Sequence, residues 1–274
     1  MRVAFCLVGI VGSVQGKYGL DGTTNSTKGL PVDFRIGHHF HKKHIFDHND
    51  VDVFIHSWSD EFKDQLLDLY QPKKYIIQEQ IDFKQNTHRM NSICSRWYST
   101  ATSVNLKKQY EIENNFVYDM VMLYRFDHIF RTNLIFSDFD PELFYIPHRD
   151  DCIDGDCKCE TTKRYYDVWF FSKSSNIDKF SSLYENLGKT GFGSPHEDCV
   201  RYIDKIGLSD KVKHNFYARR DCDAVRSVFK NCEYRGENNF NFTNAFGALT
   251  YVPNGMNSDD GTANRGVNVQ GTWT

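Results

Sequence analysis

The sequence predicts an α/β fold in which helices flank a mostly parallel β-sheet. Short apolar runs alternate with longer polar or amphipathic segments over the first 130 residues, and this alternation is typical of right-handed βαβ units. The apolar runs are nearly continuous, as expected for parallel strands buried on both faces. No fixed-period repeat interrupts the pattern, so one domain over residues 1–274 is expected.

The first half of the chain, residues 1–130, carries the regular part of the pattern. Its first strand, RVAFCLVG, is almost wholly apolar and ends on a glycine. One later segment opens with acids and places Phe62, Leu66 and Leu69 or Tyr70 on one face, which predicts an amphipathic helix. In chain order, the expected elements are a strand at 2–9, a loop at 15–29, a helix at 34–48, a strand at 51–58, a helix at 60–70, a strand at 73–80, a helix at 92–115 and a strand at 118–130.

The second half, residues 131–253, is less regular, because a charged loop that carries cysteines separates its apolar runs. The expected elements there are strands at 143–147 and 167–172 and helices at 176–187 and 195–208. Residues 254–274 are too polar to form a core of their own.

Composition excludes several classes of partner. The formal net charge of -3 provides no basic field for a polyanion, so nucleic acid is not an expected partner. No apolar run approaches the roughly 18 residues of a membrane span, and the apolar start reads as a strand rather than a signal peptide. Eight cysteines in 274 residues are too dilute for a disulfide scaffold, which favours a reducing, cytoplasmic location.

Three clusters of candidate site residues follow predicted parallel strands: Val8 to Ser13, His56 to Trp58, and Arg125 to Asp127. In doubly wound sheets ligands bind beyond the carboxyl ends of the strands. We therefore expect the three clusters to share one edge of the sheet and to form the binding site.

The Arg125 and Asp127 pair suits a diphosphate and its metal. Asp127 offers the hard oxygen that Mg²⁺ or Mn²⁺ prefers, and Arg125 suits a phosphate or a neighbouring carboxylate. An ordinary salt bridge at a strand end explains the pair equally well.

Glu197 and Asp198 follow a proline at a predicted helix start. Either acid could be a general base that takes a proton from an attacking hydroxyl. Acids in this position also complement the helix dipole, which without further context is the simpler explanation.

Two other clusters carry metal-ligand residues. His41, His44 and His48 fall at helical spacing, although a solvated basic face is the favoured explanation. The loop with Cys152, Cys157 and Cys159 lacks paired C-x-x-C spacing, so free thiols are favoured there over zinc or a disulfide.

Taken in order, these segments resemble the nucleotide-sugar glycosyltransferases of GT-A type, in particular those of bacterial surface-polysaccharide clusters and of chlorella-infecting giant DNA viruses, which include xylosyltransferases of the capsid glycan. The resemblance covers residues 2–205, and its specific part is the pattern Y-D, an apolar run, then R-x-D-x-x-F in YDMVMLYRFDHIF.

The resemblance implies a GT-A, Rossmann-like fold with a nucleotide-sugar half at 1–130 and an irregular acceptor-side half at 131–253. It implies transfer of a sugar, xylose above all, from a UDP-sugar to a hydroxyl of a glycan acceptor with inversion, in capsid glycosylation within the host cytoplasm. It also implies a divalent metal at Asp127, the second acid of a D-x-D motif in which Arg125 replaces the first.

The remaining roles follow the same resemblance. It assigns the catalytic base to Glu197 or Asp198. The implied donor-binding residues are Val8, Gly9, Ile10, Ser13, His56, Trp58, Arg125 and Asp127, although a core tryptophan explains Trp58 equally well. A non-catalytic carbohydrate- or nucleotide-binding module and a nucleotide-sugar hydrolase are the alternative functions.

Overall fold

The computed structural model describes residues 1–11, 34–148, 165–190, 193–217 and 221–224, together with two short strands further on. The loop predicted at 15–29, Ser13, the loop with Cys152, Cys157 and Cys159, and the tail at 254–274 lie outside the described residues.

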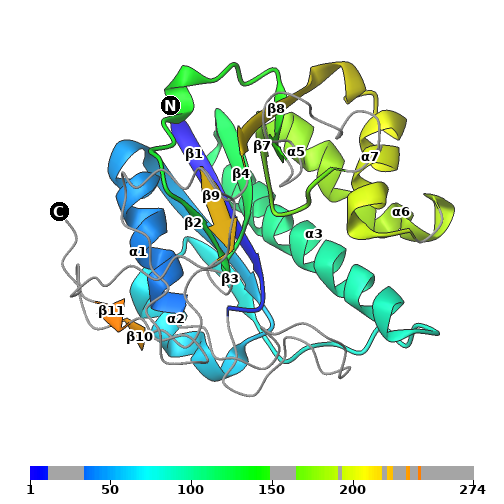
Figure 1. The fold of residues 1–274 in the computed structure, drawn as a ribbon, viewed down its shortest axis with the longest axis horizontal. Coiled ribbons are helices and arrows are strands. Elements are labelled where there is room, and N and C mark those ends of the chain that lie inside the picture. The colour runs from blue at the N-terminus through cyan, green and yellow to red at the C-terminus, as the bar shows by residue number, and fades with distance from the viewer. Residues whose placement is uncertain are drawn as a thin grey trace, which may run out of the picture.

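A seven-stranded sheet in the order β3-β2-β1-β4-β7-β6-β8 forms the centre of the molecule (Figure 1). Its strands are β1 Arg2–Gly9, β2 Asp50–Ser57, β3 Lys74–Ile77, β4 Met120–Arg125, β6 Phe144–His148, β7 Trp169–Ser172 and β8 Val212–Tyr217. Strand β7 lies antiparallel between β4 and β6, whereas the other pairs are parallel. The predicted mostly parallel α/β sheet is therefore confirmed, while β8 and the reversal of β7 were not predicted.

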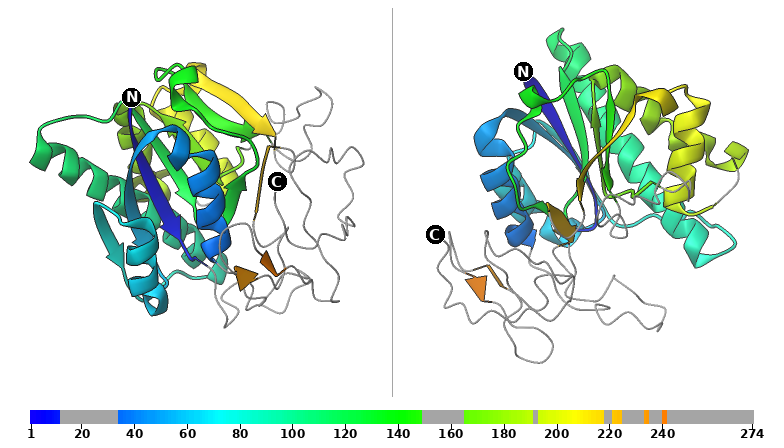
Figure 2. Two further views of the ribbon diagram at one scale, coloured as in Figure 1. Left: turned by 90° about the vertical axis from the view of Figure 1, so that its left-hand side faces the viewer. Right: turned by 45° about the horizontal axis from the view of Figure 1, so that its top comes forward.

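Helices cover both faces of this sheet (Figures 1 and 2). Helices α1 and α2 pack on one face, and α3, α5, α6 and α7 pack on the other. Their bounds are α1 Phe34–His44, α2 Lys63–Tyr70, α3 His88–Asn114, α5 Ser174–Ser181, α6 Leu183–Thr190 and α7 Pro195–Lys205. Short 3₁₀ helices lie at Phe46–His48, Asp60–Phe62, Phe136–Asp138 and Ser209–Lys211.

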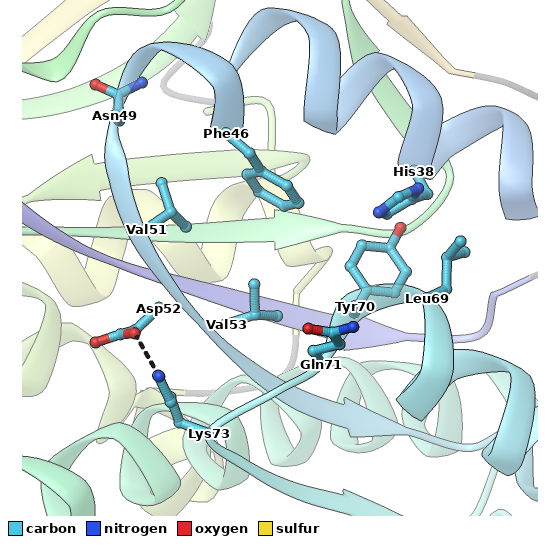
Figure 3. A pocket seen from close by; sticks show the side chains of 10 residues that line it. All are labelled: His38, Phe46, Asn49, Val51, Asp52, Val53, Leu69, Tyr70, Gln71 and Lys73. Carbon is cyan, nitrogen blue, oxygen red and sulfur yellow. Dashed lines mark ion pairs between the residues drawn. The ribbon is translucent and has the colours of Figure 1, made fainter. Parts of the chain in front are cut away.

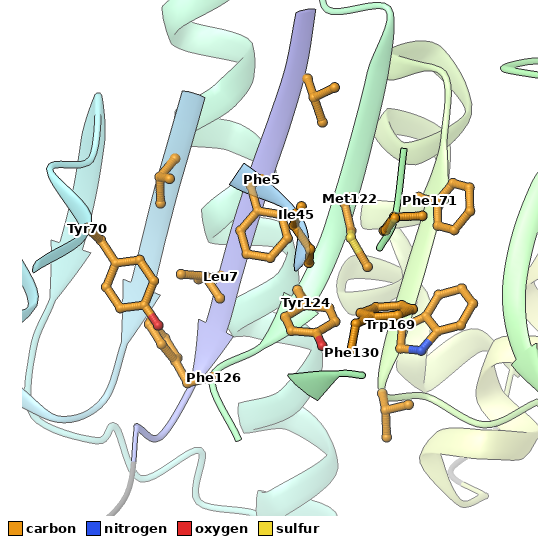
Figure 4. Packing of buried hydrophobic residues seen from close by; sticks show 14 of the residues in the cluster. Phe5, Leu7, Ile45, Tyr70, Met122, Tyr124, Phe126, Phe130, Trp169 and Phe171 are labelled. Atoms are coloured by element: carbon orange, nitrogen blue, oxygen red, sulfur yellow. The ribbon is translucent and has the colours of Figure 1, made fainter. Parts of the chain in front are cut away.

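Alternation along the strands divides the core into two layers. In β1, Phe5 and Leu7 face α1 and α2, whereas Ala4 and Cys6 face α3, because successive side chains of a strand point to opposite sides. The first layer is rich in aromatic rings, with Tyr124 packed between the rings of Phe5 and Phe130 (Figure 4). Both faces of β1 are thus buried, as its apolar sequence predicted.

The segment predicted as one strand at 118–130 is divided in two. Strand β4 ends at Arg125, Phe126 and Asp127 make a turn, and β5 His128–Phe130 pairs antiparallel with β9 Cys222–Ala224. The strands β10 Glu233–Tyr234 and β11 Phe240–Asn241 pair with each other. The turn directs Asp127 back toward Arg125, and this decides the geometry of the site.

The histidines of α1 do not form a solvated basic face, and that expectation was wrong. His41 is fully buried, and its ring nitrogens lie 3.1 Å from the Tyr70 hydroxyl and 2.8 Å from the His128 carbonyl oxygen. His44 is also buried and lies at the end of α1, so His48, in the following 3₁₀ helix, does not continue the helical spacing. These side chains are occupied in packing, which leaves no histidine metal site in α1.

Within the residues that the structure describes, no helix combines the length and apolar character needed to cross a membrane.

Candidate functional site at the carboxyl edge of the sheet

The carboxyl ends of β1, β2 and β4 lie side by side. Val8 is the register partner of His56 on β2 and of Arg125 on β4. The chain passes from β1 outward to β2 on one side and returns in β4 on the other, so the edge between β1 and β4 is a topological switch point. The described residues of the three predicted clusters thus lie at the one edge where such sheets bind ligands.

The end of β1 is fixed to the end of β2 by backbone contacts. Gly9 has a φ of +100°, a conformation that side chains disfavour. This turn lets the Gly9 carbonyl accept a hydrogen bond from the Trp58 N–H at 3.2 Å, and the Val11 N–H donates to the Ser59 hydroxyl at 3.4 Å. Val8 is buried, while Gly9 and Ile10 remain partly accessible, as a binding wall requires.

His56 and Trp58 are buried in an aromatic cluster on the α3 side of the sheet. Their ring centroids are 4.5 Å apart, and Tyr98 of α3 stacks on Trp58 at 5.4 Å. Burial lowers the pKa of His56 to about 4, and within the described part of the chain neither of its ring nitrogens has a hydrogen-bond partner. Trp58 is 1% exposed, so the core explanation for this residue fits its placement better than stacking on a ligand.

Arg125 and Asp127 form a bidentate salt bridge. The Arg125 Nε donates to Asp127 Oδ1 at 2.8 Å, and Nη2 donates to Oδ2 at 2.7 Å. The Asp127 side chain is 3% exposed and that of Arg125 is 22% exposed. The guanidinium therefore covers both carboxylate oxygens and is itself the accessible member of the pair.

A divalent metal fits these residues poorly. Both oxygens of Asp127 accept from a cation, and the described residues contain no group of three or more histidine, cysteine, aspartate or glutamate side chains that could hold an ion. Mg²⁺ and Mn²⁺ require free oxygen ligands. The metal at Asp127 stays a prediction from the resemblance.

Glu197 and Asp198 both have structural partners at the start of α7. The Ser194 hydroxyl accepts from the Glu197 N–H at 3.3 Å, while the Glu197 carboxylate accepts from the Ser194 N–H at 3.0 Å, so the pair forms a capping box. Asp198 is fully buried, and its Oδ1 accepts from Arg201 at 2.6 Å and from the Gly193 N–H at 3.1 Å. Burial raises the pKa of Asp198, an effect that Arg201 opposes.

A further buried group lies beside these residues, and the sequence did not reveal it. Asp167 precedes β7, whose first residue pairs with Tyr124, next to Arg125. Because β7 runs antiparallel to β4, its start lies at the carboxyl end of β4. There Asp167 contacts Arg96 of α3 at 3.4 Å and His196 of α7 at 3.0 Å.

Tyr166 connects this group to the turn after β4. Its ring lies 6.3 Å from that of His128, the residue after Asp127, and 5.8 Å from that of His196. The Tyr165 N–H also donates to the His196 carbonyl at 3.2 Å. The end of β4, residues 165–167 and the start of α7 therefore form one continuous region, which we call the carboxyl-edge site.

A separate pocket lies at the other end of β2 (Figure 3). Its volume is about 300 Å³, and it opens between α1, α2 and the first residues of β2. Asp52 and Lys73 pair across its rim at 3.3 Å. Asn49 is already saturated by two carbonyls and one N–H. The pocket contains none of the predicted site residues.

Comparison with known proteins adds no family to this geometry: no protein-family model matches the sequence, and no curated protein is similar to it.

Proposed function

We propose that this chain is a GT-A type glycosyltransferase that moves a sugar from a UDP-sugar to a hydroxyl group of a glycan acceptor. The observation that carries the proposal is the convergence of the ends of β1, β2 and β4 with the start of α7 at a topological switch point. A sheet of this order, with a single reversed strand, is compatible with the GT-A fold that the sequence resemblance implies.

In this proposal the end of β1 binds the nucleoside and Arg125 binds the diphosphate. Gly9 and Ile10, which are partly accessible, supply the wall for uracil and ribose, and the buried Val8 supports them from the core. Arg125 is the more exposed partner of its salt bridge, and a planar guanidinium suits a phosphate through two parallel hydrogen bonds. Asp127 holds Arg125 in place until the more highly charged diphosphate competes for it.

The reaction is a single displacement at the anomeric carbon. A base removes the proton of the acceptor hydroxyl, the acceptor oxygen forms the new bond to carbon, and the bond from carbon to the diphosphate oxygen breaks. UDP leaves with the electron pair, and fixed cationic groups stabilise the charge that develops on it. Attack opposite the leaving group inverts the configuration.

The test measures UDP release from UDP-xylose, the donor that the resemblance implies, with and without an oligosaccharide acceptor. Release that depends on the acceptor supports glycosyl transfer. Equal release without acceptor identifies a hydrolase. A rise in Tm with UDP or glycan but no release identifies a binding module, because a ligand that binds only the folded state raises its stability.

Variants test the assignment of the diphosphate site. We expect Arg125→Ala to raise the KM for the donor and to lower kcat/KM at least tenfold. Arg2→Ala is the matched control, since it removes an arginine–aspartate pair, Arg2 to Asp52 at 3.2 Å, from the opposite edge of the sheet. Equal activity of the Arg125→Ala variant and this control would show that Arg125 does not bind the diphosphate.

Metal removal separates the two roles considered for Asp127. If Arg125 carries the diphosphate, transfer should persist within about threefold after treatment with a chelator. A complete loss of transfer that Mn²⁺ restores would instead show that the reaction needs a metal, and would return Asp127 to the role of its ligand if Asp127→Asn also weakens the Mn²⁺ response.

A further inference from the structure

We propose that His196 is the general base of the transfer, and that Asp167 and Arg96 hold its imidazole in position. This inference rests on the proposed glycosyl transfer and deepens it, because it names the group that receives the acceptor's proton. It replaces Glu197 and Asp198 in that role with a residue that the sequence did not single out.

The hydrogen-bond partners of His196 fix which of its nitrogens is basic. The Nδ1 atom lies 3.0 Å from Asp167 Oδ1 and 3.0 Å from the Tyr165 carbonyl oxygen. Both partners are acceptors, so Nδ1 carries the hydrogen. The lone pair of the neutral ring is then on Nε2, on the other side of the imidazole, as a general base requires.

Asp167 is suited to orient this ring and to stabilise its protonated form. Its side chain is 8% exposed. Burial alone would raise the pKa of Asp167, but the hydrogen bond from His196 and the charge of Arg96 outweigh burial and hold the pKa well below its ordinary value. The carboxylate therefore stays ionised, and an ionised carboxylate beside Nδ1 favours proton uptake at Nε2.

Arg96 holds Asp167 from the opposite side. Its guanidinium donates to the Asp167 backbone carbonyl at 2.8 Å, to Asp167 Oδ2 at 3.4 Å and to the Thr100 hydroxyl at 2.6 Å. These contacts join α3, the start of β7 and the start of α7 through one buried aspartate. Arg96 and Asp167 are accordingly positioning residues, whereas His196 is the residue that meets the substrate.

The two acids next to His196 are less suitable. Glu197 closes the capping box with Ser194, and the fully buried Asp198 contacts Arg201 and the Gly193 N–H. His196 is 36% exposed at its side chain. It is therefore more accessible than the fully buried Asp198. It also lies beside Tyr166, which reaches the turn after β4.

The acceptor, the UDP-sugar and His196 are the only groups that exchange bonds or protons in this step. The acceptor O–H bond breaks and its proton passes to Nε2, while the oxygen pair forms the bond to the anomeric carbon. The bond between that carbon and the diphosphate oxygen breaks, and UDP leaves with the electron pair. The imidazolium, paired with Asp167, then releases its proton to water.

The experiment compares His196→Ala with the wild type in acceptor-dependent UDP release. We expect kcat to fall about 10²- to 10⁴-fold, the usual contribution of a general base, with the KM for the UDP-sugar unchanged. Added imidazole should restore part of the lost kcat. His196→Asn, whose amide can still donate to Asp167, guards against misfolding and should lose as much. The rise in Tm with UDP should match the wild type in both variants, and His48→Ala is the control for an exposed histidine.

The outcomes separate this inference from the proposed function. If the wild type shows no acceptor-dependent release, the proposed function and the inference fall together. If the wild type is active but His196→Ala keeps more than a tenth of kcat, or loses kcat with no response to imidazole, only the role of His196 is overturned. If kcat falls further in Glu197→Gln or Asp198→Asn than in His196→Asn, that acid is the general base instead of His196.

Discussion

Gly9 shows how a single residue can fix the geometry of the carboxyl edge. Its φ of +100° turns the chain at the end of β1 and points its carbonyl to the Trp58 N–H. Among the residues that the structure describes, a Cβ built at Gly9 would meet no atom within 4 Å beyond its chain neighbours. The requirement for glycine is therefore one of backbone conformation and not of space.

Two alanine substitutions test this distinction with opposite signs. Gly9→Ala should lower the free energy of unfolding by about 1–3 kcal/mol, because a side chain disfavours this conformation. Gly188→Ala lies in α6, where a Cβ would again meet no described atom within 4 Å outside its own helix backbone. This substitution should raise the free energy of unfolding by about 0.5–1 kcal/mol, since alanine is the better helix former. Urea unfolding measures both, and equal effects of the two substitutions would contradict the conformational argument.

Lys107 fixes the position of helix α3 through ion pairs of its buried side chain. It lies in α3 with a fully buried side chain that contacts Glu111 and Asp178 at 2.8 Å each, and it also donates to the Ser174 hydroxyl. Glu111 in turn accepts from the Tyr118 backbone N–H at 2.9 Å. One buried cation thus joins α3, α5 and the approach to β4.

Replacing Lys107 should be costly, because it leaves the buried Glu111 and the partly buried Asp178 without their cation. We expect Lys107→Met to lower the free energy of unfolding by about 3–5 kcal/mol. The control is Lys74→Met, which removes the 2.7 Å pair with Glu113, whose side chain is 56% exposed. That change should cost less than about 1 kcal/mol. Denaturant midpoints decide the matter, and a loss below 1 kcal/mol for Lys107→Met would show that the cluster contributes little.

The predicted elements were most accurate where the sequence pattern is local. Strand β1 was predicted with its observed bounds, because the glycine that ends it is visible in the sequence. Helix α3 begins four residues before its prediction, at a Thr87 cap whose hydroxyl accepts from the Met90 N–H. The reversal of β7 was missed because strand direction depends on pairing with β4, which no local pattern encodes.

Across the whole molecule, local sequence patterns predicted only those site residues that lie at the end of a recognisable element. Arg125 and Asp127 stand at the end of an obvious strand, so the parallel-sheet rule was enough to place them at the ligand-binding edge. Asp167 and His196 are 29 positions apart, and Arg96 lies in a helix far earlier in the chain. Only the reversal of β7 and the docking of α7 bring these three together. A network assembled by tertiary structure leaves no motif to read.

Buried histidines should make the whole molecule sensitive to acid. Burial lowers the pKa values of His38 and His56 to about 4 and that of His41 to about 3. Each folded-state value lies below the unfolded value near 6.5, so the unfolded chain binds more protons as the pH falls below 6.5, and stability must fall with it. The shifts correspond to a loss of about 2 kcal/mol per histidine between pH 7 and pH 5. The pKa of Asp167 is depressed, so the stability that this carboxylate provides is lost only at still lower pH.

Urea unfolding at the two pH values measures the loss. His56→Phe, which keeps the ring contacts and removes two buried nitrogens, should reduce it by about 2 kcal/mol, while His48→Gln at an exposed site should not change it. A pH dependence that is the same in His56→Phe and in the wild type would mean that His56 takes up its proton in the folded chain near pH 6.5.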